Sequence, residues 1–573
     1  MRSLVAHNKT LILSIAFLIG SSTSLFAAPP DAGSIRRDVG DRIQQTPDVP
    51  HSESLAPSGN ARPDQPESSD KLSVRKFVIT GATIFSQEEL LKVLDFNTEK
   101  MLSLSEMEKA ATKITNFYSA RGYLAKALIP AQNMHDGIVT IEVIEARLGS
   151  VKVTKNSCVR LNRSRASRFV TYSQPIGELI RIKNLEKGLL LLQETPGVHS
   201  STIIRPGKNQ PLVDALITLD TAPLFTGYAD VDNFGNIDTG EHRVSAGINI
   251  DSPRCIGDRV SLKSVYSSGI HYGRALYSIP LGPRGTRVSL SMSTLKYTLG
   301  GEYASLNATG RSFTAGTMVS HPLIITRGSN LYGLLGYDYH RFVDEVSQIT
   351  TSDKTIHTGT LGLAGGWYDE LLGGGYMSAG GILTIGTLDL SRIADLQQTD
   401  IAGPSTAGGY QKLNVSLART QQLLDNRLRL VVSLTGQIAS GNLDSSEKFS
   451  LGGPEGVRAY AASEGTGDEG FIMTAELSKA LSPSAQLFGF FDYGQIRQFV
   501  TTWDGWAPDA GTPNTYSLNG AGIGVRWTPV QKLSIKATVV TRLSSNPSPS
   551  RNGLDNDGTK REPRFWFESS YAF

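Results

Sequence analysis

The feature that most limits the fold of this chain is a regular alternation of apolar and polar residues from Leu224 to the C-terminus. Residues 427–435 place four apolar side chains on one face: Leu428, Leu430, Val432 and Leu434. Residues 534–541 place Ile535, Ala537 and Val539 on one face and Lys536 and Thr538 on the other. A period of two predicts β-strands with one apolar and one polar face. Such strands build either a soluble all-β domain or a barrel that crosses a membrane.

The connections between these segments favour the membrane barrel. Short connections occur at 282–285, 424–426 and 482–484, and long ones at 391–409, 441–470, 498–515 and 544–562. Short turns at one end and long loops at the other are typical of outer-membrane barrels. The last segment ends in a bare Phe573, which shares one face with Phe565, Phe567 and Tyr571. We therefore expect residues 223–573 to form an all-β transmembrane barrel of about 16 antiparallel strands, surrounded by outer-membrane lipid.

Composition agrees with an exported β-rich protein. The 573 residues are too many for one core, and 58 glycines suit many turns. A net charge of +3 argues against nucleic-acid binding. No segment reaches about 18 consecutive apolar residues. Residues 1–27 have a positive start, a short apolar run at 11–19 and a small-residue end, which predicts a secretory signal peptide.

The region after the predicted signal divides into a helix, a linker and two similar units. Residues 28–45 predict a short N-terminal helix, although a disordered terminus is the alternative, and residues 46–70 read as a linker. Residues 71–147 predict an α+β unit with a short helix at 87–94 and a longer helix that begins at Ser103, with Glu106 completing a capping box. Residues 148–222 repeat the pattern with helices at 163–172 and 182–193. The exposed sheet edges of such units can dock an extended polypeptide.

Two short stretches of the barrel region carry the clearest motifs. One is a glycine-rich loop that holds an arginine, and its residues are Gly452, Gly453, Pro454, Glu455, Gly456, Val457, Arg458 and Tyr460. The other is a strand-like stretch with an acid, Asp492, between Phe490 and Gly494. Arginine can hold a carboxylate through two parallel hydrogen bonds. Without further information, Arg458 could equally be a solvated loop residue.

With these motifs the chain resembles the outer-membrane transporters of two-partner secretion, the haemolysin secretion/activation family of the Omp85 superfamily. Residues 457–460 match the VRG[FY] loop motif with Ala459 in place of glycine, and residues 490–494 match the F-x-D-x-G strand motif. The resemblance implies that the two α+β units are POTRA domains and that residues 28–45 are a plug helix. It also implies that the loop between strands 11 and 12 enters the barrel, where Arg458 pairs with Asp492 on strand 13.

The resemblance further implies a pore that recognises one large exoprotein in the periplasm and exports it unfolded without ATP. The partner would be an adhesin, a haemolysin or a contact-dependent toxin. Tyr571 and Phe573 would form the assembly signal for the barrel assembly machinery, and we expect a monomer. The alternative is an Omp85-type insertase. No catalytic constellation stands out and no cofactor is expected, so an enzyme is not predicted.

The two cysteines and one acidic loop complete the candidate sites. Cys158 and Cys255 would lie on the same side of the membrane, where they either form a disulfide or remain separate thiols. The stretch Asp555-Asn-Asp-Gly558 lacks the glutamate of a calcium loop, so we expect a solvated loop and no metal site.

Overall fold

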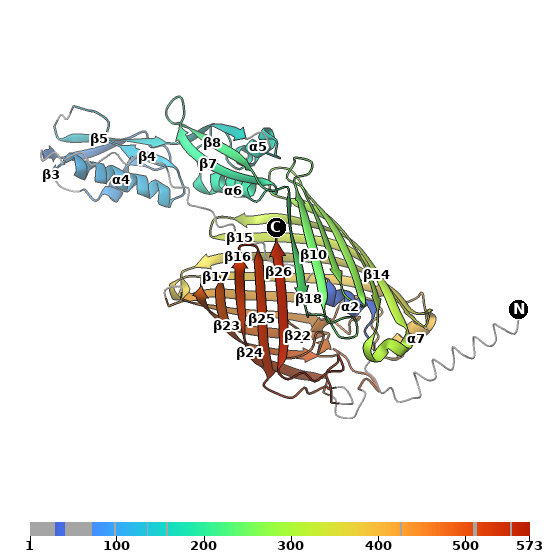
Figure 1. Ribbon diagram of the computed structural model, residues 1–573. Helices are drawn as coiled ribbons and strands as arrows, with labels where there is room; N and C mark the ends of the chain where they lie inside the picture. Colours follow the sequence, from blue (N-terminus) through green and yellow to red (C-terminus); the bar gives the residue numbers. More distant parts are fainter. Residues whose placement is uncertain are drawn as a thin grey trace, which may run out of the picture.

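The structure is a computed structural model that describes residues 29–40, 71–96, 99–133, 136–155, 159–424, 427–507, 513–549 and 553–573. Two α/β units stand at one end of a closed barrel, and a short helix lies within the barrel (Figure 1). The predicted signal peptide, residues 41–45 of the predicted helix and the predicted linker lie outside the described residues.

The first α/β unit contains two helices and a three-stranded sheet of order β2-β5-β4. Its elements are β1 Leu72–Val74, β2 Lys76–Thr80, α3 Gln87–Leu94, β3 Lys100–Leu102, α4 Leu104–Ala120, β4 Ala125–Leu128 and β5 Ile138–Glu145. The predicted capping box at Ser103 and Glu106 is confirmed, because each side chain accepts a hydrogen bond from the other residue's backbone amide. Ile114 and Tyr118 of α4 pack against Ile141 of β5 in its core.

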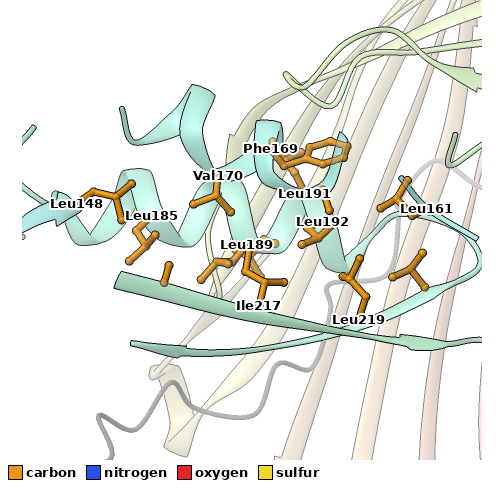
Figure 2. Packing of buried hydrophobic residues seen from close by; sticks show 14 of the residues in the cluster. Leu148, Leu161, Phe169, Val170, Leu185, Leu189, Leu191, Leu192, Ile217 and Leu219 are labelled. Carbon is orange, nitrogen blue, oxygen red and sulfur yellow. The ribbon is translucent and has the colours of Figure 1, made fainter. Parts of the chain in front are cut away.

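The second unit repeats this arrangement. Its elements are β6 Arg147–Lys155, α5 Arg163–Ser173, α6 Ile182–Gln193, β7 Val198–Pro206 and β8 Leu212–Thr221. The sheet order is β6-β8-β7, with one parallel and one antiparallel pair, as in the first unit. Figure 2 shows Leu185, Leu189 and Leu192 of α6 facing Ile217 and Leu219 of β8. The predicted internal repeat is therefore present in the fold.

Backbone and side-chain contacts fix the second unit to both of its neighbours. Leu124 and Ile182 donate to carbonyls across the boundary between the units, at 3.1 and 2.9 Å. Against the barrel, the hydroxyl of Tyr332 donates to the carboxylate of Glu194 at 2.9 and 3.0 Å. Arg327 pairs with Glu186 at 3.1 Å. These contacts hold the α/β units at the mouth of the barrel.

The barrel closes with sixteen antiparallel strands, as predicted. They are β9 Phe225–Asp232, β10 Arg243–Asp251, β11 Arg259–Tyr266, β12 Ile270–Pro280, β13 Arg287–Thr298, β14 Ala308–Ile325, β15 Ser329–Val346, β16 Ile349–Asp369, β17 Gly375–Asp389, β18 Gly408–Leu423, β19 Leu428–Ala439, β22 Glu469–Ser482, β23 Ala485–Arg497, β24 Thr515–Val530, β25 Leu533–Arg542 and β26 Arg564–Ala572. The last strand pairs with the first from Glu568↔Asp232 to Ala572↔Tyr228.

Elements outside the wall lie in the connections. The long loops at the end away from the α/β units contain η1 Gly301–Leu306, α7 Ala394–Ala402 and a short strand pair, β20 Phe449–Ser450 with β21 Thr466–Gly467. The helix η2 Leu371–Gly373 lies in a turn at the other end. Figure 1 shows α7 at the barrel end opposite the α/β units.

The outer face of the wall is apolar. Leu335, Leu361 and Leu383 lie side by side on β15, β16 and β17, and 59%, 62% and 36% of their surfaces are exposed. Soluble proteins rarely leave such a continuous apolar belt in water, whereas a bilayer covers it in outer-membrane barrels. Among the described residues, no helix is long and apolar enough to span a membrane.

One buried carboxylate organises the first α/β unit. Glu145 accepts hydrogen bonds from the amides of Thr83 and Ile84 at 2.8 and 2.9 Å and from the hydroxyl of Tyr118 at 2.8 Å. Burial raises the pKa of Glu145, but the hydrogen bonds outweigh it and hold the pKa below its ordinary value. The ionised form is therefore the one that stabilises this unit.

We expect Glu145→Gln to lower the free energy of unfolding of this unit by about 2 kcal/mol, because hydrogen bonds to an ionised group are lost. The wild-type stabilisation is complete above the unfolded pKa of about 4.3 and is lost as the pH falls through the lower folded value. Hydrogen exchange of residues 71–147 in the intact protein, corrected for intrinsic rates, measures both effects. Glu142→Gln, on the other face of β5, is the control. If Glu145→Gln lost protection on acidification to the same extent as the wild type, the role of the ionised Glu145 would be contradicted.

Candidate functional site in the barrel lumen

A long loop between β19 and β22, the eleventh and twelfth strands, folds back into the barrel. We call residues 440–468 the inner loop. Leu451, Val457 and Tyr460 of this loop are fully buried, and they pack in one cluster with inward-facing wall residues such as Phe488 and Leu518. The loop therefore has its own hydrophobic contact with the lumen side of β22 to β26.

Arg458 of the inner loop meets Asp492 of β23, the thirteenth strand. The guanidinium Nε and Nη2 donate to the two carboxylate oxygens at 2.9 and 2.8 Å, and the Arg458 amide donates to one of them at 3.1 Å. Thr474 donates to the same carboxylate at 3.1 Å. Asp492 is completely buried, so its charge depends on these four donors. The structure thus joins the two motif residues in a bidentate ion pair.

Two further charges, which the sequence reasoning missed, complete a balanced network. Arg458 Nη1 lies 3.2 Å from the carboxylate of Glu476, and Arg526 reaches the same carboxylate at 2.6 Å. Two arginines thus face two carboxylates. A charge on the lipid face of a barrel strand is destabilising near the middle of the bilayer, so charged residues there are expected to face the interior. That rule applied to β22 and β24 could have found Glu476 and Arg526.

An aromatic ring lies under each of these arginines. The guanidinium carbon of Arg458 is 3.3 Å from the ring centre of Phe490, and that of Arg526 is 4.2 Å from the ring centre of Phe488. A cation over an aromatic face is attracted by the ring quadrupole, more strongly where water is excluded. This contact explains why Phe490 belongs to the strand motif with Asp492.

The inner loop is also held by the last strand and the last long connection. The indole of Trp566 donates to the carbonyl of Arg458 at 2.7 Å, and the hydroxyl of Tyr460 donates to the carbonyl of Ser544 at 2.9 Å. Alternation along β26 places Phe565 outward and Trp566 inward. This alternation was the signal that could have identified Trp566.

Steric constraints explain why glycine occurs at these positions of the loop motif. Gly453 has a φ of +113°, which disfavours any side chain. A Cβ at Gly456 would lie 1.9 Å from the carbonyl oxygen of Leu451, and one at Gly452 would lie 2.3 Å from that of Ala461. Pro454 and Glu455 form the turn between these glycines. On β23, a Cβ at Gly494 would lie 2.9 Å from Leu451, so this glycine makes room for the loop.

Ala459, which replaces the usual glycine, fits because the opposing wall residue is glycine. Ala459 is not among the residues with positive φ and is buried. Gly520 of β24 faces it, and a Cβ there would lie 2.4 Å from the Ala459 methyl group. The methyl group therefore occupies the space of the missing side chain at Gly520.

The two aspartates of the stretch at 555–558 are buried and paired with arginine. Asp555 is 1% exposed and binds Arg564 at 3.0 Å as well as Arg542. The prediction of a solvated loop is therefore wrong for Asp555, because two buried arginines require a counter-charge there. Among the described residues, no group of three or more His, Cys, Asp and Glu side chains is placed to hold a metal ion.

The N-terminal helix α2, Ala32–Val39, lies in the lumen against β13, β14 and β15. Its apolar residues Ala32, Ile35 and Val39 pack in a cluster with Tyr272 and Phe342 of the wall. The predicted helix is present over these residues, with Asp31 as its N-cap. The helix therefore occupies the lumen beside β13, β14 and β15.

One buried lysine connects α2 to the inner loop. Lys354 Nζ of β16 lies 2.8 Å from Asp31 at the start of α2 and 2.7 Å from Asp444 of the inner loop. Ser445 donates to Asp31 at 2.6 Å, and Arg37 donates to the Ser445 carbonyl at 2.8 Å. The helix and the loop thus share contacts and one cation.

The remaining predicted residues lie at the mouth near the α/β units. Tyr571 is 47% exposed and Phe573 is 48% exposed on the outer face. The backbone of Phe573 exchanges hydrogen bonds with Gly227 at 2.9 and 3.1 Å. Cys255 is exposed in the β10–β11 turn, and Cys158 lies outside the described residues. The disulfide stays a prediction.

We expect Gly520→Ala to expel the inner loop, because its Cβ would overlap the Ala459 methyl group. Protease cleavage within residues 440–468 of the purified protein should rise at least about tenfold, since a clash of this kind costs about 1–3 kcal/mol. Adding Ala459→Gly should restore protection. Gly489→Ala is the control, because a Cβ there meets only a carbonyl at 3.9 Å. Failure of the second substitution to restore protection would contradict the contact.

Comparison with known proteins places this geometry in a family. The family model described as "Haemolysin secretion/activation protein ShlB/FhaC/HecB" matches residues 214–527, more than half of the chain. The model described as "POTRA domain, ShlB-type" matches residues 72–146.

Similar proteins share the whole organisation. Heme/hemopexin transporter protein HuxB of Haemophilus influenzae is 26% identical over 549 residues, which cover 93% of this chain and 95% of that protein. Outer membrane transporter CdiB of Dickeya dadantii is 21% identical over 492 residues, 83% of this chain and 85% of the relative. The solved structure of CdiB from Escherichia coli has the same fold, with a TM-score of 0.65 at 19% identity over 91% of this chain and 94% of that one. The chain therefore belongs to the haemolysin secretion/activation family of two-partner secretion transporters, with its barrel in the outer membrane and its POTRA domain in the periplasm.

Proposed function

We propose that this protein recognises one large exoprotein in the periplasm and moves it unfolded through the barrel to the cell surface without ATP. The proposal rests on the observation that two elements other than wall strands lie inside the barrel. Both α2 and the inner loop occupy the lumen through non-covalent contacts, and neither is a strand of the wall. A pore of this kind is closed at rest and opens when these two elements move.

The α/β units are the entrance in this proposal. They are fixed at the periplasmic mouth by the Glu194 and Glu186 contacts. In the second unit β7 is an edge strand, which pairs only with β8 among the described residues. An extended chain can add to such an edge through backbone hydrogen bonds. Capture there would deliver an unfolded segment next to the barrel opening.

The similar proteins are transporters, which supports a secreted protein as the partner. They include the heme/hemopexin transporter protein HuxB, the outer membrane transporter CdiB and the hemolysin transporter protein ShlB. For this chain we propose an adhesin, a haemolysin or a contact-dependent toxin, exported by a monomer that the barrel assembly machinery inserts. The match to the haemolysin secretion/activation family favours this function over an insertase.

The role of the Arg458–Asp492 pair in export can be tested directly. We expect Arg458→Ala to leave membrane insertion intact and to lower secretion of the partner at least about tenfold, because breaking a buried pair costs about 3–5 kcal/mol. Secretion by Arg458→Lys should lie between that of the wild type and that of Arg458→Ala, since lysine keeps the charge but not the bidentate geometry. Heat-modifiable migration measures insertion, and immunoblotting of the medium measures secretion.

The matched control is Arg497→Ala, which breaks an exposed pair to Glu469 between the same two strands, β22 and β23. Exposed pairs contribute little to stability. Normal secretion by Arg458→Ala, or an equal loss in Arg497→Ala, would rule out the proposed role of the inner-loop pair.

A second test concerns the helix α2. We expect Lys354→Met to open the pore, because Asp31 and Asp444 would then face each other without the cation they share. Conductance of the purified protein in planar bilayers should rise to the level of a variant that lacks residues 29–40. Lys479→Met, which removes an exposed charge from the outer face of β22, should conduct like the wild type. Unchanged conductance in Lys354→Met would contradict the role of this lysine in holding α2.

A further inference from the structure

A row of basic side chains crosses the outer face of the barrel near its extracellular end. His271 of β12 lies opposite Lys296 of β13, and Lys296 lies opposite Arg311 of β14. All three side chains are exposed. Adjacent strands are about 4.8 Å apart, so the three residues span about 10 Å of the wall.

The strand alternation shows that these side chains point to the lipid and not to the lumen. Tyr272 and Tyr297, which follow His271 and Lys296 in the chain, are buried in the lumen cluster with α2. Ser312, which follows Arg311, is also buried. Successive residues of a strand face opposite sides, so the basic row faces outward.

The row lies just beyond the apolar belt. On β13, Leu290 and Met292 point outward and are 52% and 57% exposed, and Lys296 lies four residues further along the same face, about 13 Å from Met292. Phe313 of β14, which is 39% exposed, lies between the belt and Arg311. The basic groups therefore stand at the level where acyl chains end and headgroups begin.

Within the described part of the chain these two cations form no close ion pair, and Arg311 acts on Asp353 only over a longer distance. Neither Lys296 nor Arg311 lies within 4.0 Å of a carboxylate oxygen, the limit for an ion pair. Asp353, on the same row, is bound by Arg341 at 2.8 and 3.0 Å. Glu345 lies one row further out. Like charges on directly opposite strand positions repel and destabilise a sheet. An anion from outside the chain would offset this repulsion between Lys296 and Arg311.

We propose that Lys296 and Arg311, with His271 beside them, bind the phosphate of a phosphorylated lipid headgroup in the extracellular leaflet. The planar guanidinium gives two parallel donors to phosphate oxygens, and the ammonium adds a point charge. The apolar side chains of Leu290, Met292 and Phe313 directly below provide the surface for its acyl chains. This second feature selects a lipid over free phosphate.

The test uses the purified full-length protein in detergent and bis-phosphorylated lipid A as the probe, with native mass spectrometry as the readout. We expect wild-type protein to retain the lipid and the double variant Lys296→Ser/Arg311→Ser to bind it at least about tenfold more weakly, since both groups that would contact the phosphate are removed. Lys479→Ser, an exposed outward lysine at the periplasmic end of β22, should bind like the wild type.

Two further measurements distinguish binding of a lipid phosphate from binding of free phosphate. Dephosphorylated lipid A should bind the wild type as weakly as the double variant binds the phosphorylated lipid, and inorganic phosphate at millimolar concentration should not displace the bound lipid. The proposal is overturned by equal retention in the double variant, by equal loss in Lys479→Ser, by undiminished binding of dephosphorylated lipid A, or by displacement with inorganic phosphate. Thermal unfolding of each variant confirms that the barrel is folded.

Discussion

The need to pair every backbone amide and carbonyl inside a bilayer determines this structure. Lipid offers no hydrogen bonds, so a β-sheet can cross it only when its last strand returns to its first. Here β26 pairs with β9 and leaves no edge in the wall. Closure around sixteen strands leaves a wide interior, and the inner loop and α2 bury their apolar side chains there. The filled lumen is thus a consequence of the closed wall.

Several of the charged groups buried in the lumen form ion pairs. Arg458 and Arg526 face Asp492 and Glu476 around the inner loop, and Lys354 faces Asp31 and Asp444 next to α2. Buried ion pairs give little net stability over apolar packing. We infer that the balanced network instead helps to select one position of the inner loop, because each charge must meet its partner.

The alternation of residues was sufficient to predict the strands, because one face had to meet lipid. It therefore predicted sixteen strands and placed Arg458 and Asp492 on the correct elements. The motif resemblance was needed to bring these two residues together, since no local pattern encodes a contact across 34 positions. The partners Glu476, Trp566 and Lys354 were missed because each lies on a different strand, and only the closed wall shows which inward positions meet.

The burial of Asp555 was missed for a different reason. Its stretch has the composition of a solvated turn, and the two arginines that bury it, Arg542 and Arg564, come from β25 and β26. Likewise, the fit of Ala459 depends on Gly520, a wall residue with no motif of its own. Such compensations become visible only when the register of neighbouring strands is known.

The position of α2 has a kinetic consequence. This helix is joined to the first α/β unit by residues 41–70, thirty residues that can span at most about 100 Å. In the function proposed above, α2 leaves the lumen during export and stays covalently near its binding surface, at an effective concentration of the order of millimolar. Under that proposal, re-closing is a first-order event whose rate does not depend on how many transporters the membrane contains. Each transporter would then carry its own plug, so that resealing begins as soon as the lumen is empty.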